Sequence, residues 1–241
     1  MRLDKLLAHT GFGTRKEVKK IIKNKYIEVN GEIITKPGTK VDPDEDDVRI
    51  GDQRIYYEEF VYFMLNKPAG VISATEDYVH ETVLDLLGPA DLVQEPHPVG
   101  RLDIDTEGLL VLTNDGQLTH QLISPKKEVD KEYYARIEGL VTEEDVEKFE
   151  EGIILIEDEE EYKTMPAVLE ILSTDERENE SEVNITIQEG KFHQVKRMFY
   201  TVDKEVLYLK RIRMNDLVLD EDLELGEYRA LTEEELEKLQ P

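Results

Sequence analysis

A succession of short strand-like segments constrains the fold of this chain most. After about residue 60, runs with the apolar pattern of strands occur at residues 61–65, 109–113, 133–137, 168–172, 183–188 and 206–214. Helix-like segments occur at residues 82–87, 117–123, 142–152, 191–200 and 232–239. Because these helices do not alternate regularly with the strands as crossovers, the pattern favours an α+β sheet over a doubly wound parallel one.

The first 57 residues predict a separate, smaller unit. Leu3, Leu6 and Leu7 have helical spacing, and Gly11 and Gly13 end that helix. Thr14-Arg15-Lys16-Glu17 is a capping box that starts a second helix. Asn30-Gly31 predicts a type I′ turn between two short strands. We therefore expect two helices and a hairpin, with a domain boundary between residues 57 and 58.

Charge is distributed unevenly along the chain. The sequence holds 30 basic and 56 acidic residues, a formal net charge of −26. Residues 1–40 nevertheless carry ten basic and four acidic side chains, and residues 191–213 carry seven and two. Because phosphate responds to charge within about 8–10 Å, two basic regions can bind nucleic acid in an acidic chain. The acidic segment Asp42–Asp47 with Gly51 indicates a last turn and a linker.

Composition excludes several classes of protein. Without cysteine the chain cannot be a disulfide scaffold, a zinc ribbon, an iron–sulfur protein or a thiol enzyme. The five histidines show no i, i+4 pair, so we expect no metal site, and we expect no cofactor. The N-terminus is not an apolar signal segment, and no apolar run approaches the roughly 20 residues of a membrane helix. We expect a cytoplasmic protein without a membrane partner.

Residues 100–110, Gly-Arg-Leu-Asp-Ile-Asp-Thr-Glu-Gly-Leu-Leu, are the strongest candidate for chemistry. Three carboxylates, an arginine and two glycines come directly before a buried strand. A carboxylate in this position can act as a nucleophile or as an acid or base. Asp103 and Asp105 could also form the carboxylate pair of a glycosidase. A polar turn bonded to its own backbone is the alternative, and these residues alone do not decide.

Motifs along almost the whole chain resemble pseudouridine synthases of the family that modifies small-subunit ribosomal RNA and several large-subunit sites. The N-terminal unit resembles the RNA-binding module named for ribosomal protein S-four, which binds structured RNA through its helical face. The catalytic matches, in the order of the family, are residues 65–71, 100–110, 131–133, 189–199 and 226–232. The resemblance implies an S-four-type RNA-binding domain at 1–57 and a pseudouridine synthase domain at 58–241. That second domain would have a mixed, largely antiparallel sheet with flanking helices.

The resemblance also implies roles for individual residues. Asp103 matches the essential aspartate, which attacks the target uridine covalently. Tyr133 matches the tyrosine that stacks on the base. Lys196 or Arg197 matches the basic residue that pairs with the aspartate and keeps it ionised, and the sequence leaves this choice open. Arg101 matches an arginine that enters the RNA helix when the base leaves its stack, a step that costs a few kcal/mol.

Basic and polar side chains of the motifs are expected to contact RNA as well. On the second N-terminal helix, cations occupy one arc beside the apolar face, an arrangement that suits a phosphate backbone. The expected RNA-binding residues are Arg2, Lys5, Arg15, Lys16, Lys19, Lys20, Lys23, Lys67, His193 and Gln194.

The function implied by the resemblance is isomerisation of one uridine in 16S ribosomal RNA to pseudouridine. The expected partner is that RNA or the assembling small subunit, and the expected state is a monomer. A large-subunit (23S) enzyme of the same family is one alternative, and a non-catalytic ribosomal-RNA-binding assembly factor is another. The presence of Asp103, Tyr133 and Lys196/Arg197 argues against the assembly factor, which needs no such aspartate. A sugar hydrolase is a more distant alternative.

Overall fold

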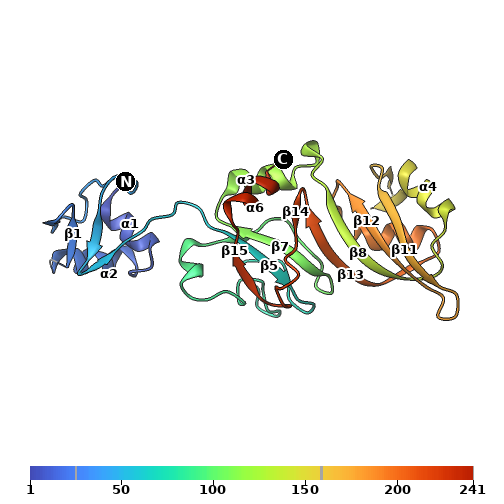
Figure 1. Ribbon diagram of the computed structural model, residues 1–241, viewed down its shortest axis with the longest axis horizontal. Coiled ribbons are helices and arrows are strands. Elements are labelled where there is room, and N and C mark those ends of the chain that lie inside the picture. Colours follow the sequence, from blue (N-terminus) through green and yellow to red (C-terminus); the bar gives the residue numbers. More distant parts are fainter. Residues whose placement is uncertain (25, 158–159, 241) are drawn as a thin grey trace. The chain divides into compact units, whose positions relative to one another are not determined.

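The computed structural model describes residues 1–24, 26–157 and 160–240. The chain forms two compact units (Figure 1). The first comprises residues 1–61 together with 87–96, which include the 3-10 turn η1 (Asp91–Gln94). The second comprises residues 62–86 and 97–241. None of the helices in the described part of the chain is long and apolar enough to cross a membrane.

The first unit combines two helices and a small antiparallel sheet around one apolar core. Its helices are α1 (Leu3–His9) and α2 (Arg15–Lys23), and Thr14 and Glu17 form the predicted capping box at the start of α2. The strand order is β2-β1-β3-β4. The strands are β1 (Ile27–Val29), β2 (Glu32–Ile33), β3 (Val48–Ile50) and β4 (Gln53–Arg54). Asn30 and Gly31 both have positive φ, as the predicted type I′ turn requires.

The segment after residue 41 is not simply a last turn and a linker, as the sequence suggested. Strands β3 and β4 form a second hairpin that extends the sheet. Val48 and Ile55 are buried in the same core as the leucines of α1. The prediction missed these strands because they hold only three and two residues among charged neighbours.

The second unit is built on a long, mixed sheet, which Figure 1 shows running through the whole unit. The strand order is β11-β12-β8-β13-β7-β5-β15, with β14 beside β13 and β6 beside β7. These strands are β5 (Tyr62–Lys67), β6 (His97–Pro98), β7 (Glu107–Thr113), β8 (Lys131–Glu138), β11 (Val168–Asp175), β12 (Glu180–Ile187), β13 (Glu205–Met214), β14 (Leu217–Val218) and β15 (Tyr228–Ala230). Among these paired strands only β7 and β13 run parallel, so the α+β class with a largely antiparallel sheet is confirmed.

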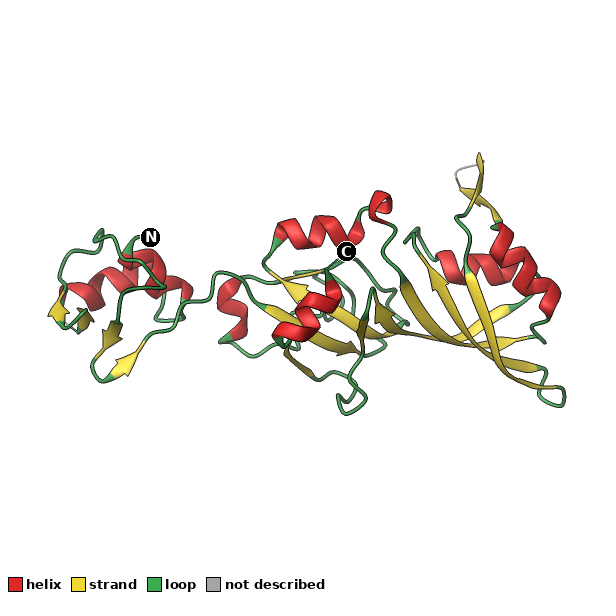
Figure 2. Ribbon diagram, turned by 45° about the horizontal axis from the view of Figure 1, so that its top comes forward, coloured by secondary structure: helices red, strands yellow, loops and turns green. Residues whose placement is uncertain are grey.

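Among the described residues, four helices and one short hairpin flank this sheet. In Figures 1 and 2, α3 and α6 lie towards the end that contains β15, and α4 lies towards the end that contains β11. The helices are α3 (Gly116–Ile123), α4 (Glu143–Glu151), α5 (Gln194–Thr201) and α6 (Glu233–Leu239), and the 3-10 turn η2 covers Pro125–Lys127. The hairpin consists of β9 (Ile154–Glu157) and β10 (Glu160–Lys163). One core cluster joins Met64, Leu109, Leu122 and Met214, so β5, β7, α3 and β13 share it.

The helix predicted at residues 82–87 is wrong. The amide and hydroxyl of Thr82 donate to Asp85 Oδ2 at 2.8 and 2.9 Å, which closes a single turn. Pro89 follows shortly after, and a proline disfavours the helical conformation in the residue that precedes it. The segment therefore forms one turn and does not continue as a helix.

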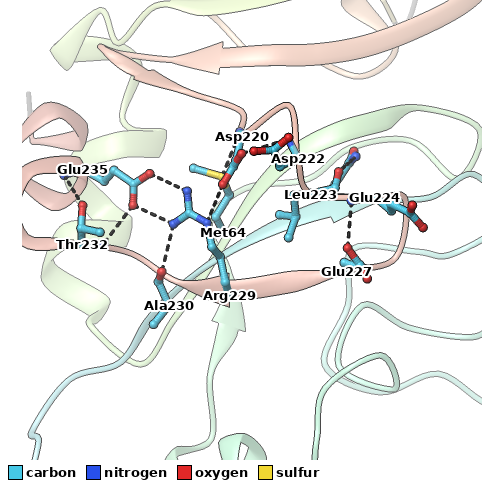
Figure 3. A network of polar contacts seen from close by, with 11 residues as sticks. Met64, Asp220, Asp222, Leu223, Glu224, Glu227, Arg229, Ala230, Thr232 and Glu235 are labelled. Carbon is cyan, nitrogen blue, oxygen red and sulfur yellow. Dashed lines mark hydrogen bonds and ion pairs between the residues drawn. The ribbon is translucent and has the colours of Figure 1, made fainter.

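A polar network fixes the end of the chain to the sheet (Figure 3). Arg229 of β15 donates to Asp220 Oδ2 at 2.8 Å and to both carboxylate oxygens of Glu235 at 2.7 and 2.8 Å. Glu235 also completes the capping box with Thr232 at the start of α6. The network therefore joins the edge strand β15 to the last helix.

Candidate active site

The loop between β6 and β7 carries Asp103, and its backbone is held on both sides of that residue. Ser73 Oγ donates to the Leu102 carbonyl at 3.1 Å and accepts from the Leu102 amide at 3.0 Å. On the other side, the Thr106 amide donates to the Asp103 carbonyl at 3.1 Å. The backbone that presents Asp103 is therefore fixed by contacts within the loop and with residue 73.

The buried ammonium group of Lys67 also holds the loop that carries Asp103. Lys67, the last residue of β5, is 0% exposed, and its Nζ donates to the carbonyls of Pro68 and Thr106, both at 2.9 Å. Burial lowers the pKa of Lys67 to about 8. Because the ammonium group is enclosed by backbone, the expectation that Lys67 contacts RNA is wrong. Its hydrogen bonds instead connect the loop that carries Asp103 to the end of β5.

Lys196 is the cation that meets Asp103. Its Nζ lies 3.0 Å from Asp103 Oδ2 and 2.6 Å from Asp105 Oδ1, so one lysine joins two carboxylates. Burial opposes the charge of Lys196, but the hydrogen bonds with Asp105 and Asp103 raise its pKa above the ordinary value. Burial likewise opposes the charge of Asp105, and the contact with Lys196 outweighs it and lowers the pKa of Asp105.

Arg197, the neighbouring residue, points to a different part of the unit. Its guanidinium donates to the carbonyls of Phe192 and Ile156 and lies 5.7 Å from the ring centroid of Tyr162. The structure therefore answers the question that the sequence left open, because it pairs Lys196, and not Arg197, with Asp103. Arg197 instead attaches α5 to the β9–β10 hairpin.

A small cavity of about 60 Å³ opens beside the Asp103–Lys196 pair. Tyr133 of β8 is 7% exposed and lines this cavity, as do Asp103, Lys196 and Arg101. Its apolar lining comes from Leu102, Ile187, Val195 and Leu209. A carboxylate, a cation and an aromatic ring thus meet in a pocket whose walls are partly polar and partly apolar.

His193 and Gln194 flank this pair in different ways. His193 Nε2 lies 3.5 Å from Asp103 Oδ1, and its ring stacks on Phe192 with centroids 3.7 Å apart. Gln194 is 4% exposed, donates to Glu189 Oε2 at 2.8 Å and accepts from the Lys191 amide at 3.1 Å. These contacts occupy the Gln194 amide in holding the turn before α5. Gln194 also lines the cavity beside Asp103, and its contact with RNA stays a prediction.

The expected RNA-binding residues of the first unit lie on its surface. The exposed side chains include Lys5, Arg15, Lys16, Lys19, Lys20 and Lys23. Arg2 is also exposed, but its guanidinium forms two 2.9 Å hydrogen bonds with the buried carboxylate of Asp4. Arg2 therefore already has a strong partner, whereas α2 presents a row of exposed cations.

Two buried cations near the site were not predicted. Lys131 is 8% exposed and Arg211 is 2% exposed, and both line a cavity next to the first one. Lys131 stands two residues before Tyr133 on β8, so strand alternation could have placed both side chains on one face. Arg211 gave no such signal, because a charged side chain in an alternating strand is ordinarily expected at the surface. In the described part of the chain, no group of three or more acidic or histidine side chains could hold a metal ion.

Comparison with known proteins identifies the family. The family model for RNA pseudouridylate synthase matches residues 61–201, and the model for the S4 domain matches residues 1–48. The chain belongs to the RNA pseudouridylate synthase family. It is therefore an RNA pseudouridine synthase with an N-terminal S4 domain, the S-four-type module recognised in the sequence.

Similar proteins align along nearly the full chain. An uncharacterized RNA pseudouridine synthase of Bacillus subtilis is 48% identical, covering 99% of this chain and 98% of the relative. Ribosomal large subunit pseudouridine synthase B of the same organism is 41% identical, with 99% and 95% covered. Ribosomal small subunit pseudouridine synthase A of Haemophilus influenzae is also 41% identical, with 99% of both chains covered. A crystal structure of a pseudouridylate synthase matches with 40% identity, 99% of both chains covered and a TM-score of 0.68.

Proposed function

We propose that this synthase converts one uridine of 16S ribosomal RNA to pseudouridine and that Asp103 is its nucleophile. The observation that carries the proposal is the Asp103–Lys196 pair at a cavity lined by Tyr133. Asp105 shares the same lysine, but it does not line the cavity. Asp103 is thus the carboxylate of the pair that a base in the cavity would meet.

The proposed reaction moves atoms only within the uridine. The Asp103 carboxylate attacks the target uridine at the sugar or the base, and the bond between N1 and the sugar breaks. The freed uracil rotates in the cavity, and its carbon 5 then bonds to the sugar carbon. The proton on carbon 5 is lost, N1 takes up a proton, and the aspartate is released. Uridine and pseudouridine are isomers, so the balanced reaction needs no external reagent.

The other residues of the site have positioning and binding roles in this proposal. Lys196 holds the carboxylate of Asp103 by a charge-assisted contact, and Tyr133 offers its ring to the uracil. Arg101 is exposed at the rim of the cavity, where it could fill the space that a flipped base leaves in the RNA. We assign Arg197 to positioning α5, since its contacts lie away from Asp103.

The choice of 16S RNA as the substrate rests on sequence similarity alone. The motifs at residues 192–199 and 226–232 favour the small-subunit enzymes, and a small-subunit relative aligns over 99% of both chains. A large-subunit target is the second candidate, because a large-subunit synthase has the same 41% identity. We further propose a monomer acting in the cytoplasm on the RNA or the assembling subunit, with residues 1–57 as the RNA-binding domain and 58–241 as the catalytic domain.

The test maps pseudouridine at single-nucleotide resolution in unmodified 16S and 23S RNA and in partly assembled small subunits. We expect wild type to form one new pseudouridine in 16S RNA and Asp103→Asn to form none while still binding the RNA. Modification of 23S RNA alone would overturn the choice of target. Activity of Asp103→Asn equal to wild type would overturn the assignment of the nucleophile.

A further inference from the structure

A second cavity of about 370 Å³ lies next to the proposed uridine site. We call it the second pocket. It shares Arg101, Tyr133 and Lys191 with the first cavity, and its other walls include Val99, Ile123, Pro125 and Met214. The catalytic proposal uses none of the residues that belong to the second pocket alone.

Two buried cations line this mostly apolar pocket. Lys131 Nζ donates to the Val129 carbonyl at 2.8 Å, and Arg211 Nε donates to the Leu109 carbonyl at 2.8 Å. Arg211 Nη2 is buried and has no hydrogen-bond partner among the described residues. Neither cation forms an ion pair with a carboxylate of the described chain within 4.0 Å, although thirteen pairs between Lys or Arg and a carboxylate occur elsewhere in it.

Holding these cations in the fold is costly without a further partner. An unpaired buried charge costs several kcal/mol, and an apolar side chain of similar size would avoid that cost. Burial, and then the neighbouring Arg211, lower the pKa of Lys131 to about 8, which reflects the same cost. The arrangement is therefore better suited to a ligand that brings hydrogen-bond acceptors into the pocket.

Glu189 lines the second pocket as well. Because a carboxylate accepts hydrogen bonds, the ligand should also carry hydrogen-bond donors on the side that faces Glu189. Glu189 Oε2 accepts from the Met165 amide at 3.1 Å and from Gln194 at 2.8 Å. An ionised carboxylate can accept about four hydrogen bonds, so Glu189 keeps acceptor capacity beyond these two. The pocket thus offers cationic donors, a carboxylate acceptor and apolar walls, which suits a flat, uncharged heterocycle with both kinds of edge better than a phosphate.

Guanine has this combination of groups. Its O6 and N7 are adjacent acceptors, for which arginine and lysine are the commonest specific partners. Its N1–H and amino groups are donors for a carboxylate. Adenine instead places an amino donor at the position of O6, facing the cations.

The two pockets adjoin at Tyr133, which lines both of them. Lys131 precedes Tyr133 by two residues on the same face of β8, about 7 Å away along the strand, and lines the second pocket. Adjoining pockets suit neighbouring nucleotides whose bases have left the stack. Unstacked, splayed bases are the usual targets of sequence-specific RNA recognition.

We propose that the second pocket binds a guanine next to the target uridine, with Lys131 and Arg211 donating to O6 and N7 and Glu189 accepting from N1–H. This inference rests on the proposed function, since it requires a uridine in the first cavity. It gives the enzyme a means of selecting its site by the identity of a base that it does not modify.

The test uses short RNAs that contain the mapped uridine, with each flanking nucleotide changed singly and guanine replaced by adenine or 7-deazaguanine. Single-turnover rates are measured for wild type and Lys131→Met, and affinities are measured on the Asp103→Asn background. At one flanking position we expect guanine to be favoured over adenine by about tenfold or more, and 7-deazaguanine, which lacks N7, to behave like adenine. We expect Lys131→Met to reduce this preference to about threefold or less.

Lys127→Met is the matched control, because it removes the same charge from an exposed position in η2 outside both pockets. We expect it to keep the guanine preference. Pseudouridine formation without any preference at a flanking position overturns this inference alone, as does a preference that survives in Lys131→Met. Equal weakening of all RNAs by Lys131→Met would identify a phosphate contact and also overturn it. No pseudouridine in any RNA overturns the proposed function, and this inference with it.

Discussion

At the scale of single residues, the site separates two aspartates that look alike in the sequence. Both carboxylates meet Lys196, at 3.0 Å for Asp103 and 2.6 Å for Asp105. The side chain of Asp103 is 26% exposed and lines the cavity, whereas that of Asp105 is 66% exposed and does not. The shorter contact with Lys196 thus belongs to Asp105, the carboxylate that does not line the cavity. We therefore assign Asp105 to positioning Lys196.

This assignment predicts different effects for substitutions in the pair. Lys196→Met should lower the single-turnover rate by about 100-fold or more, because it removes the preorganised cation beside the nucleophile. Lys196→Arg should retain more activity than Lys196→Met, since it keeps the charge. Asp105→Asn is the matched control and should cost less than about tenfold. Rates of pseudouridine formation on saturating RNA measure all three, and a larger loss for Asp105→Asn than for Lys196→Met would contradict the assignment.

The sequence indicated most of the candidate site, but not the surroundings of each side chain. Asp103, Tyr133 and Lys196 meet at one cavity, as their motifs suggested. Choosing between Lys196 and Arg197 required knowing which side of α5 faces Asp103, and a sequence motif does not show this. Lys67 was misjudged because the sequence does not show whether a lysine is exposed or, like this one, is buried and donates hydrogen bonds to backbone carbonyls. Arg211 was missed for the same reason.

At the scale of elements, the parallel contact between β7 and β13 depends on a glycine. Gly108 of β7 has φ of +100°, and a Cβ built there would lie 2.2 Å from the Arg211 carbonyl oxygen. That atom is backbone of the facing strand, so a side chain can be accommodated only by moving a strand. The close approach lies one residue after Glu107, at the end of the loop that presents Asp103.

Gly108→Ala should therefore destabilise the second unit by about 3 kcal/mol, through backbone strain and the clash with β13. Gly116→Ala is the matched control, because Gly116 has no atom within 4 Å of the added Cβ and no positive φ. It should change stability by no more than about 0.5 kcal/mol. Denaturant unfolding followed by circular dichroism compares the two, and equal stabilities would contradict the close packing of β7 on β13.

The Arg229–Glu235 contact predicts a dependence of stability on pH. Hydrogen bonds from Arg229 lower the pKa of Glu235 to about 2 from its ordinary 4.5. A carboxylate with a depressed pKa in the folded state stabilises the fold above its unfolded pKa and loses that effect as pH falls through the folded value. Wild type should exceed Glu235→Gln in stability by about 1–2 kcal/mol at pH 7, and the difference should shrink towards pH 2.

Glu234→Gln is the control for this experiment. Glu234 is the preceding residue of α6, and it pairs with Lys238 at 2.7 Å while its side chain is 78% exposed. An exposed ion pair contributes little, so its removal should have almost no effect at either pH. Unfolding free energies of the three proteins at pH 7 and pH 3 provide the comparison. A constant difference between wild type and Glu235→Gln across this range would contradict the account.

Local signals predicted elements well where start and end were both explicit. The capping box predicted at Thr14–Glu17 marked a true helix, α2. At residues 82–87 the turn closed by Thr82 and Asp85 is followed by Pro89, and it does not continue as a helix. Short strands such as β4 and β15 have two or three residues and leave no periodic pattern. The pairing of β15 also depends on β5, which is far away in the chain.

At the scale of the whole molecule, basic residues are concentrated in an otherwise acidic enzyme. The net charge of −26 opposes non-specific binding to RNA, so affinity must come from local cationic surfaces. The exposed face of α2 is one such surface, and it lies in the S4 domain. Separate surfaces for RNA binding and for catalysis predict that the two properties can be changed independently.

Lys19→Gln with Lys23→Gln should weaken RNA binding and reduce the slope of log affinity against log salt by about 1.5, because two phosphate contacts are lost. The single-turnover rate at saturating RNA should remain unchanged. The control removes Lys148 and Lys238 in the same way, since both are already paired with glutamates. Affinities measured at several salt concentrations test this, and an equal change of slope in both double variants would contradict a role for α2.

The measurement that tests the central claim most directly follows the hydrogen on carbon 5 of uridine. RNA labelled with tritium at that position releases the label only when carbon 5 forms its new bond to the sugar. We predict release by wild type and by Asp105→Asn, and none by Asp103→Asn, although all three bind the RNA. Release by Asp103→Asn at the wild-type rate would contradict the assignment of Asp103 as the nucleophile.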